Sequence, residues 1–243
     1  MKTSDLDRIG ETYHASSSVP DKHIEDICQQ YSAKWILNEL LGATRVLEMG
    51  YGDGIITRAL VEGGKAVTVL EGSKFLSNLV GAEMGGQVEC CNSMFETFSP
   101  TGEKFDAIVA SHVLEHVDDP VGLLIRMKNW LVDQGKIVVV VPNCESIHRR
   151  LAVNMNLQPQ LDSLSDRDRV VGHQRVYSYR GLEKDLRGAG YAISSSTGFF
   201  LKPFSNSMML SCSVELLHAM NHIANEIPKE LLANIGVAAS VHS

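Results

Sequence analysis

Three glycines and two acids are the residues whose spacing first points to chemistry. The stretch VLEMGYGDG places Gly50, Gly52 and Gly54 at alternate positions behind a short apolar run, and Glu48 precedes them. Glycines in such a turn permit positive φ and let a ligand approach the backbone, while the helix that follows offers free N–H groups. Glu71 follows Gly50 by 21 residues, about where nucleotide-binding βαβ units place the acid that binds a ribose. These residues predict a nucleotide-like ligand.

The charge of Glu48 indicates which ligand this is. A carboxylate at this strand end would repel the pyrophosphate of a dinucleotide, but it would attract the ammonium group of an amino acid. S-adenosylmethionine carries an ammonium group and a sulfonium and has no phosphate. The spacing G-x-G-x-G, in place of G-x-G-x-x-G, also disfavours a dehydrogenase.

The stretch CNSMFETF (91–98) follows the third predicted strand. An adenine pocket needs an acceptor for the exocyclic amine, which Asn92 or Ser93 would supply. It also needs an apolar wall, for which Met94 or Phe95 is suitable. Core packing is the alternative interpretation of Met94 and Phe95.

Histidines are the candidate bases. Methyl transfer from a sulfonium mainly requires alignment of the acceptor, but a hydroxyl acceptor must also lose a proton, and histidine titrates near neutral pH. His112 lies in SHVLEHV after the fourth predicted strand, and His173 lies in GHQRVYS. Both are predicted catalytic residues. Glu115 and His116 are expected to support loop backbone.

Short β-rich runs alternate with helical patterns from residue 44 onward. The predicted strands are 45–49, 66–70, 87–91, 105–111 and 136–141, and the predicted helices between them are 55–62, 73–83 and 119–132. Outside this region we expect a helix over 21–41, helix and loop over 144–178, a helix over 179–189, a strand over 191–197, a helix over 213–225 and a strand over 235–241. Continuous apolar strands alternating with helices indicate a parallel sheet covered on both faces, with ligands at the edge where the strands end.

Four motifs carry a resemblance to a known family. VLEMGYGDG, VLEGS, FDAIVASHVLEHVDDP and VVVVPN follow one another with the spacing of class I S-adenosylmethionine-dependent methyltransferases, which this chain resembles over 44–143. The stretch VGHQRVYSYRGLEKDLRGAGY (171–191), followed by GFFLKPFSN, resembles bacterial members that act on sugars or small natural products and are loosely similar to ubiquinone-pathway O-methyltransferases. The resemblance implies a Rossmann-like α/β fold whose seven-stranded, mostly parallel sheet has the order 3-2-1-4-5-7-6. Within a single domain it implies an N-terminal helical lid (1–43), a cofactor-binding core (44–143) and a substrate-covering insert with the end of the sheet (144–243).

The site residues follow from these arguments and from the resemblance. The predicted contacts of S-adenosylmethionine are Tyr13, Glu48, Gly50, Gly52, Gly54, Glu71, Gly72, Asn92, Ser93, Met94, Ser111 and His112. The predicted substrate contacts are Asn143, His148, His173, Tyr177, Lys202 and Asn206. The basic stretch IHRR (147–150) is expected to form a solvated helix face. No metal site is predicted, because the five cysteines show no C-x-x-C spacing.

Composition limits the partners. The formal net charge is −7, which disfavours nucleic acid, and no D/N-P-P-aromatic clamp follows the fourth predicted strand. The longest apolar run, IVVVV, is far shorter than a bilayer requires, and the polar N-terminus lacks a signal-peptide core, so we expect a cytoplasmic protein. O-methylation of a small molecule is favoured. N-methylation of an amine or amino sugar, a non-catalytic cofactor-binding subunit and a homodimer stay open.

Overall fold

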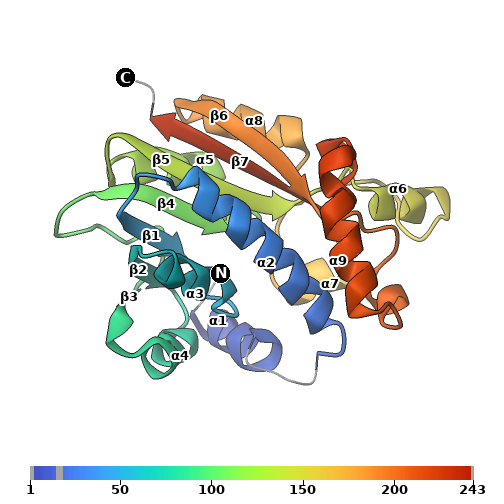
Figure 1. The fold of residues 1–243 in the computed structure, drawn as a ribbon, viewed down its shortest axis with the longest axis horizontal. Helices are drawn as coiled ribbons and strands as arrows, with labels where there is room; N and C mark the ends of the chain where they lie inside the picture. Colours follow the sequence, from blue (N-terminus) through green and yellow to red (C-terminus); the bar gives the residue numbers. More distant parts are fainter. Residues whose placement is uncertain (1–2, 15–18, 242–243) are drawn as a thin grey trace.

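The computed structural model describes residues 3–14 and 19–241, so residues 1–2 and 15–18 of the predicted lid and residues 242–243 at the end lie outside the described residues. One seven-stranded sheet has the predicted order β3-β2-β1-β4-β5-β7-β6 (Figure 1). Its strands are β1 (Arg45–Met49), β2 (Ala66–Glu71), β3 (Val88–Asn92), β4 (Phe105–Ser111), β5 (Leu131–Pro142), β6 (Tyr191–Phe199) and β7 (Asn234–Val241). β1 to β5 pair in parallel, and β7 runs antiparallel to both β5 and β6. The predicted fold class is confirmed.

Helices cover both faces of the sheet (Figure 1). One face carries α2 (Lys22–Glu39), α3 (Ile55–Glu62), α4 (Lys74–Met84) and α9 (Val214–His222), and the other carries α5 (Pro120–Lys128) and α8 (Tyr179–Gly188). Successive side chains of β1 point to opposite faces of the sheet. Val46 packs on the face that carries α2, and Leu47 packs on the face that carries α5. Burial on both faces explains why the central strands read as continuous apolar runs.

The remaining helical elements are short. They are α1 (Thr3–Ile9), the π-helical turn η1 (Gly10–His14), α6 (Ile147–Asn154), α7 (Asp166–Val170) and the 3₁₀ turns η2 (Gly85–Gln87), η3 (Asn206–Met209), η4 (Ile223–Glu226) and η5 (Lys229–Leu231). Within the described ranges, the helices are all too short or too polar to cross a bilayer.

Three predicted boundaries are wrong by more than two residues. The helix predicted over 119–132 ends at Lys128, because the chain enters β5 at Leu131, which pairs with Phe105. The register then shifts before Lys136 pairs with Ala107, so the strand predicted over 136–141 omits the beginning of β5. The helix predicted over 213–225 ends at His222 and continues as η4. The limits of the three predicted segments within the domain stay predictions.

Candidate active site

A cavity of about 800 Å³ opens at the edge where the parallel strands end. Its walls come from the turns after β1, β2 and β4, from the N-terminal segment and α2, and from the chain around α6, α7 and η3. Ligands of open α/β sheets bind at this edge, so the cavity lies where the sequence predicted it.

The glycine turn after β1 has the left-handed backbone that glycine favours. Gly50, Gly52 and Gly54 have φ of 78°, 54° and 69°. Gly50 and Gly52 line the cavity, and a Cβ on Gly50 would meet no atom within 4 Å. Gly54 instead caps α3 and does not line the cavity, so its predicted contact with the cofactor is replaced by a structural role. A Cβ on Gly54 would lie 2.6 Å from the hydroxyl oxygen of Tyr51.

Both predicted acids face the cavity from buried positions. The carboxylate of Glu71 accepts hydrogen bonds from the backbone N–H of Tyr51 (2.9 Å) and of Ser73 (2.7 Å), which ties the end of β2 to the glycine turn. Glu48 is 3% exposed, and its Oε2 has no hydrogen-bond partner. Burial raises the pKa of Glu48 to about 8. A buried carboxylate oxygen without a partner fits a ligand that brings a positively charged donor.

The predicted adenine contacts divide into two groups. Met94 and Gly72 line the cavity, and a Cβ on Gly72 would lie 2.8 Å from Leu6 and 3.1 Å from the Met94 sulfur. Asn92 and Ser93 do not line it, and their contacts with adenine stay predictions. The Asn92 amide donates to the Glu71 carbonyl (2.9 Å), and the Ser93 hydroxyl donates to the Met94 carbonyl (3.3 Å), so both side chains are used within the sheet edge and its turn.

Tyr13 lines the cavity, but its hydroxyl already has partners. It donates to Glu25 on α2 (2.5 Å) and accepts from Arg167 on α7 (2.6 Å). Arg167 also pairs with Glu25 (2.8 Å) and with Asp21. These contacts join the N-terminal segment, α2 and α7 at one wall of the cavity.

Ser111 and His112 line the cavity at the end of β4. His112 has a φ of 57°, and its backbone N–H donates to the Val140 carbonyl (2.8 Å). Its Nδ1 lies 3.1 Å from Oε1 of Glu115, a fully buried carboxylate. Burial acts to lower the pKa of His112, but the hydrogen bond and charge of Glu115 outweigh it, so the pKa is raised. The ring is thereby oriented by a carboxylate, as in many enzymes whose histidine acts as a base.

His173 lines the cavity beside this group and has a carboxylate of its own. Its Nδ1 lies 2.9 Å from Asp168 Oδ1. The other oxygen of Asp168 accepts from the Arg149 guanidinium (2.7 Å). Arg149 is 7% exposed, so the predicted solvated face over 147–150 is wrong for this residue, while Arg150 is exposed as expected.

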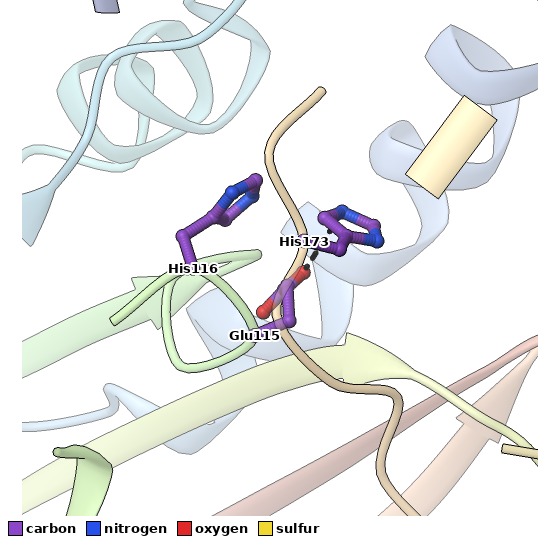
Figure 2. Close-up of side chains that lie close together, drawn as sticks. All are labelled: Glu115, His116 and His173. Carbon is purple, nitrogen blue, oxygen red and sulfur yellow. Dashed lines mark ion pairs between the residues drawn. The ribbon is translucent and has the colours of Figure 1, made fainter. Parts of the chain in front are cut away.

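Hydrogen bonds between two loops bring His173 to Glu115 and His116. The Gln174 backbone N–H donates to the Glu115 carbonyl (2.8 Å), and its side-chain amide donates to the His116 carbonyl (2.7 Å). Figure 2 shows Glu115, His116 and His173 together, with a dashed line for the ion pair between Glu115 and His173. The rings of His116 and His173 meet edge to face with centroids 4.7 Å apart. Burial lowers the pKa of His116 to about 4.

Sequence reasoning missed the partners of this group. The sequence patterns do not distinguish Asp168 or Gln174 from other polar residues. The only available signal was the order Ser165 to Asp168, which forms a capping box at the start of α7. That pattern predicts where a helix begins, but it does not indicate which histidine the acid contacts.

The predicted substrate contacts also divide. His148, Lys202 and Asn206 line the cavity, as does Asn143. The Asn143 amide already donates to the Glu230 and Leu232 carbonyls (2.8 Å each), and its oxygen accepts from the Glu145 backbone N–H (2.9 Å).

Tyr177 does not line the cavity. It is buried in the core, and its hydroxyl donates to Asp185 (3.1 Å). These contacts give its predicted substrate contact no support, and that contact stays a prediction.

Comparison with known proteins decides the family. The profile of a methyltransferase domain matches residues 20–196. The chain belongs to this methyltransferase family. It is a class I S-adenosylmethionine-dependent methyltransferase, and S-adenosylmethionine is its cofactor. The ubiquinone biosynthesis O-methyltransferase of Xylella fastidiosa is 27% identical over 194 residues, which cover 77% of each chain.

Two solved structures show the same fold. The 1,6-didemethyltoxoflavin-N1-methyltransferase of Burkholderia thailandensis, with S-adenosylhomocysteine bound, has a TM-score of 0.63 and 18% identity, covering 99% of this chain and 88% of that one. A possible histamine N-methyltransferase of Thermotoga maritima has a TM-score of 0.66 and 16% identity, covering 98% and 100%.

Proposed function

We propose that this methyltransferase methylates a hydroxyl oxygen of a small molecule, with His112 as the base. The observation that carries the proposal is the pair formed by His112 and Glu115 at the end of β4 (3.1 Å). Glu115 is fully buried and engages Nδ1 of the ring, so Nε2 is the nitrogen left to accept a proton. An amine acceptor that arrives neutral would not need such a pair.

The cofactor supplies a methyl group that is already activated on sulfur. The acceptor oxygen gains the methyl group, the bond between methyl and sulfur breaks, and the hydroxyl proton passes to His112. Glu115 stabilises the imidazolium that results, because its carboxylate stays bonded to Nδ1. The residues around the cavity align the acceptor, and alignment of this kind is worth about 7–11 kcal/mol.

The outer part of the cavity supports an acceptor that has an apolar portion. Five large apolar side chains line it and are still substantially exposed: Leu151, Met155, Leu157, Phe204 and Met208. Lys202 and His148 line the same cavity, and burial lowers the pKa of both side chains. This mixture suits a ring or chain with a few polar substituents better than a fully polar acceptor.

The Xylella relative gives independent support, because its name describes O-methylation in ubiquinone biosynthesis. The cavity has a volume of about 800 Å³ and takes its walls from several elements around the strand ends, which also suits a small acceptor. N-methylation is the second candidate. It differs from O-methylation because a neutral amine acceptor does not need a base, whereas a hydroxyl acceptor does.

A methyl-transfer screen over hydroxylated aromatic compounds, sugars and amines tests the proposal. We expect turnover with hydroxylated acceptors, and His112→Asn should reduce it by about 10²–10⁴-fold, which is more than the loss of S-adenosylhomocysteine affinity. Tyr179→Phe, outside the cavity, serves as the matched control. Turnover confined to amines, or full activity in His112→Asn, would contradict the assignment of oxygen as the acceptor.

A further inference from the structure

We propose that Glu115, His116 and His173 form a binding site for one divalent first-row transition-metal ion. One potential ligand atom from each residue lies within 4.8 Å of the other two. Glu115 is fully buried, and its Oε2 has no hydrogen-bond partner. Leaving a buried carboxylate oxygen without a partner is unfavourable, and a cation would remove that penalty.

The surroundings of the two histidines match those of metal ligands. Nδ1 of His173 is engaged by Asp168 (2.9 Å), which leaves Nε2 on the side of Glu115 (4.0 Å). His116 has a hydrogen bond to the backbone of Gly172. Histidines that bind metal usually donate their other ring N–H to a carboxylate or a backbone carbonyl, which fixes the tautomer and the ring orientation.

The spacing requires only a small adjustment. Ligand atoms about 2.0–2.2 Å from a metal lie about 3–4 Å from one another. His173 Nε2 lies 4.0 Å from Oε1 of Glu115, the oxygen that also contacts His112, and the ligand atoms of the three residues lie within 4.8 Å of one another. Side-chain rotations that shorten these distances and turn Oε2 of Glu115 toward the ion would complete a site with two imidazoles and one carboxylate. This donor set suits Mn²⁺, Fe²⁺, Co²⁺ or Zn²⁺ better than Mg²⁺ or Ca²⁺, which prefer oxygen ligands.

Three protein ligands leave coordination positions open for the acceptor. A bound divalent cation lowers the pKa of a hydroxyl group beside it, which would assist removal of the proton by His112. His112 contacts Oε1 of Glu115, whereas the unpaired oxygen is Oε2, so the base and the ion can share this carboxylate. The catalytic role rests on the proposed O-methylation, but binding of the ion does not.

A second pair of histidines supplies the control. His218 and His222 lie four residues apart on α9 and both contact the Tyr31 hydroxyl (3.2 and 3.0 Å). Histidines with this spacing on one helix face can bind transition ions without any function. A titration must therefore distinguish the two sites.

The test is a titration of metal-free protein with Co²⁺ in the absence of cofactor and acceptor. Binding is measured by calorimetry and by visible absorption. We expect one Co²⁺ per chain with a d–d spectrum. Glu115→Gln and His173→Asn should each weaken binding by at least about 100-fold, beyond the 10–100-fold that loss of an outer partner causes. The double variant His218→Ala and His222→Ala should bind as the wild type does. Binding that survives Glu115→Gln, or that disappears with the α9 pair, would overturn the site.

A measurement on the wild type covers the case in which a variant fails to fold. Bound Co²⁺ is paramagnetic and should strongly shift the proton NMR signals of the His116 and His173 rings. The signals of the His218 ring should shift only weakly. Unshifted signals from His116 and His173 would refute the proposal by themselves. A failed acceptor screen would leave the Co²⁺ result unchanged, so the two proposals fail separately.

Discussion

The pH dependence of cofactor binding tests the role of Glu48. Burial raises the pKa of this carboxyl group to about 8 in the free protein. We predict that the ammonium group of the bound ligand lies beside Glu48 and favours its ionised form. Because the free protein binds the proton more tightly than the complex does, ligand binding should release a proton below pH 8. The affinity should therefore rise with pH up to about 8.

The size of the effect follows from this pKa. With a pKa of about 8, about 1% of Glu48 is ionised at pH 6 and about half at pH 8. If Glu48 stays ionised in the complex, the affinity for S-adenosylhomocysteine should increase about 50-fold between these pH values, which corresponds to about 2.3 kcal/mol. S-adenosylhomocysteine carries the same ammonium group as the cofactor, so the sulfonium plays no part in the measurement.

Titration calorimetry at pH 6, 7 and 8, in buffers with different ionisation enthalpies, gives both the affinity and the number of protons released. Glu48→Gln cannot ionise, so its affinity should be lower at pH 8 and nearly independent of pH. The ligand 5′-methylthioadenosine keeps adenine, ribose and sulfur but lacks the amino acid part. It should show little pH dependence, which separates Glu48 from Glu71, whose pKa burial also raises.

One result would refute the reasoning. If S-adenosylhomocysteine binds the wild type with equal affinity at pH 6 and pH 8 and releases no proton, Glu48 does not receive the ammonium group. Equal pH dependence for both ligands would place the titrating group beside the adenosine part of the ligand and not at Glu48.

Three further predictions concern single positions. Tyr177→Phe should lose one hydrogen bond and about 0.5–1.5 kcal/mol of unfolding free energy with unchanged turnover; a large fall in turnover would return Tyr177 to the substrate site. Gly54→Ala should lower stability more than Gly50→Ala, because the Cβ at position 54 would lie 2.6 Å from Tyr51. Gly50→Ala should mainly weaken S-adenosylhomocysteine binding. Thermal unfolding and calorimetry measure the two effects, and a larger stability loss in Gly50→Ala would contradict the prediction. The free energy of unfolding of His112→Gly should exceed that of His112→Ala by about 1–2 kcal/mol, because φ is 57° at this position. Equal stabilities of the two variants would show that the backbone is not strained.

The sheet could be predicted because its signals are local. The run from Arg45 to Met49 is short, its apolar residues are all buried, and it ends at glycines that mark the turn. Topology then brings Glu48 and Glu71 to one edge, because parallel neighbouring strands end together. The start of β5 at Leu131 could not be predicted in the same way, since pairing with Phe105 across an irregular register leaves no periodic pattern.

The part of the site that depends on contacts between loops was not predictable. Nothing in the local sequence around His173 indicates that Gln174 bonds to the loop after β4. Arg149 looked like a surface residue because its neighbours are polar, but Asp168 neutralises it in a buried position. Asn92 had the right residue type for an adenine contact, yet its amide bonds to the Glu71 carbonyl at the sheet edge.

His112 shows where the requirements of the fold and of the chemistry separate. Its φ of 57° belongs to a region that glycine occupies without strain and other residues rarely adopt. The backbone bond to Val140 (2.8 Å) would form equally well with glycine at this position. The backbone therefore does not require histidine here, although histidine costs about 1–3 kcal/mol of strain. That side chain faces the cavity and is oriented by Glu115, so the proposed role of the imidazole as the base would account for the residue type at this position, whereas the turn alone would not.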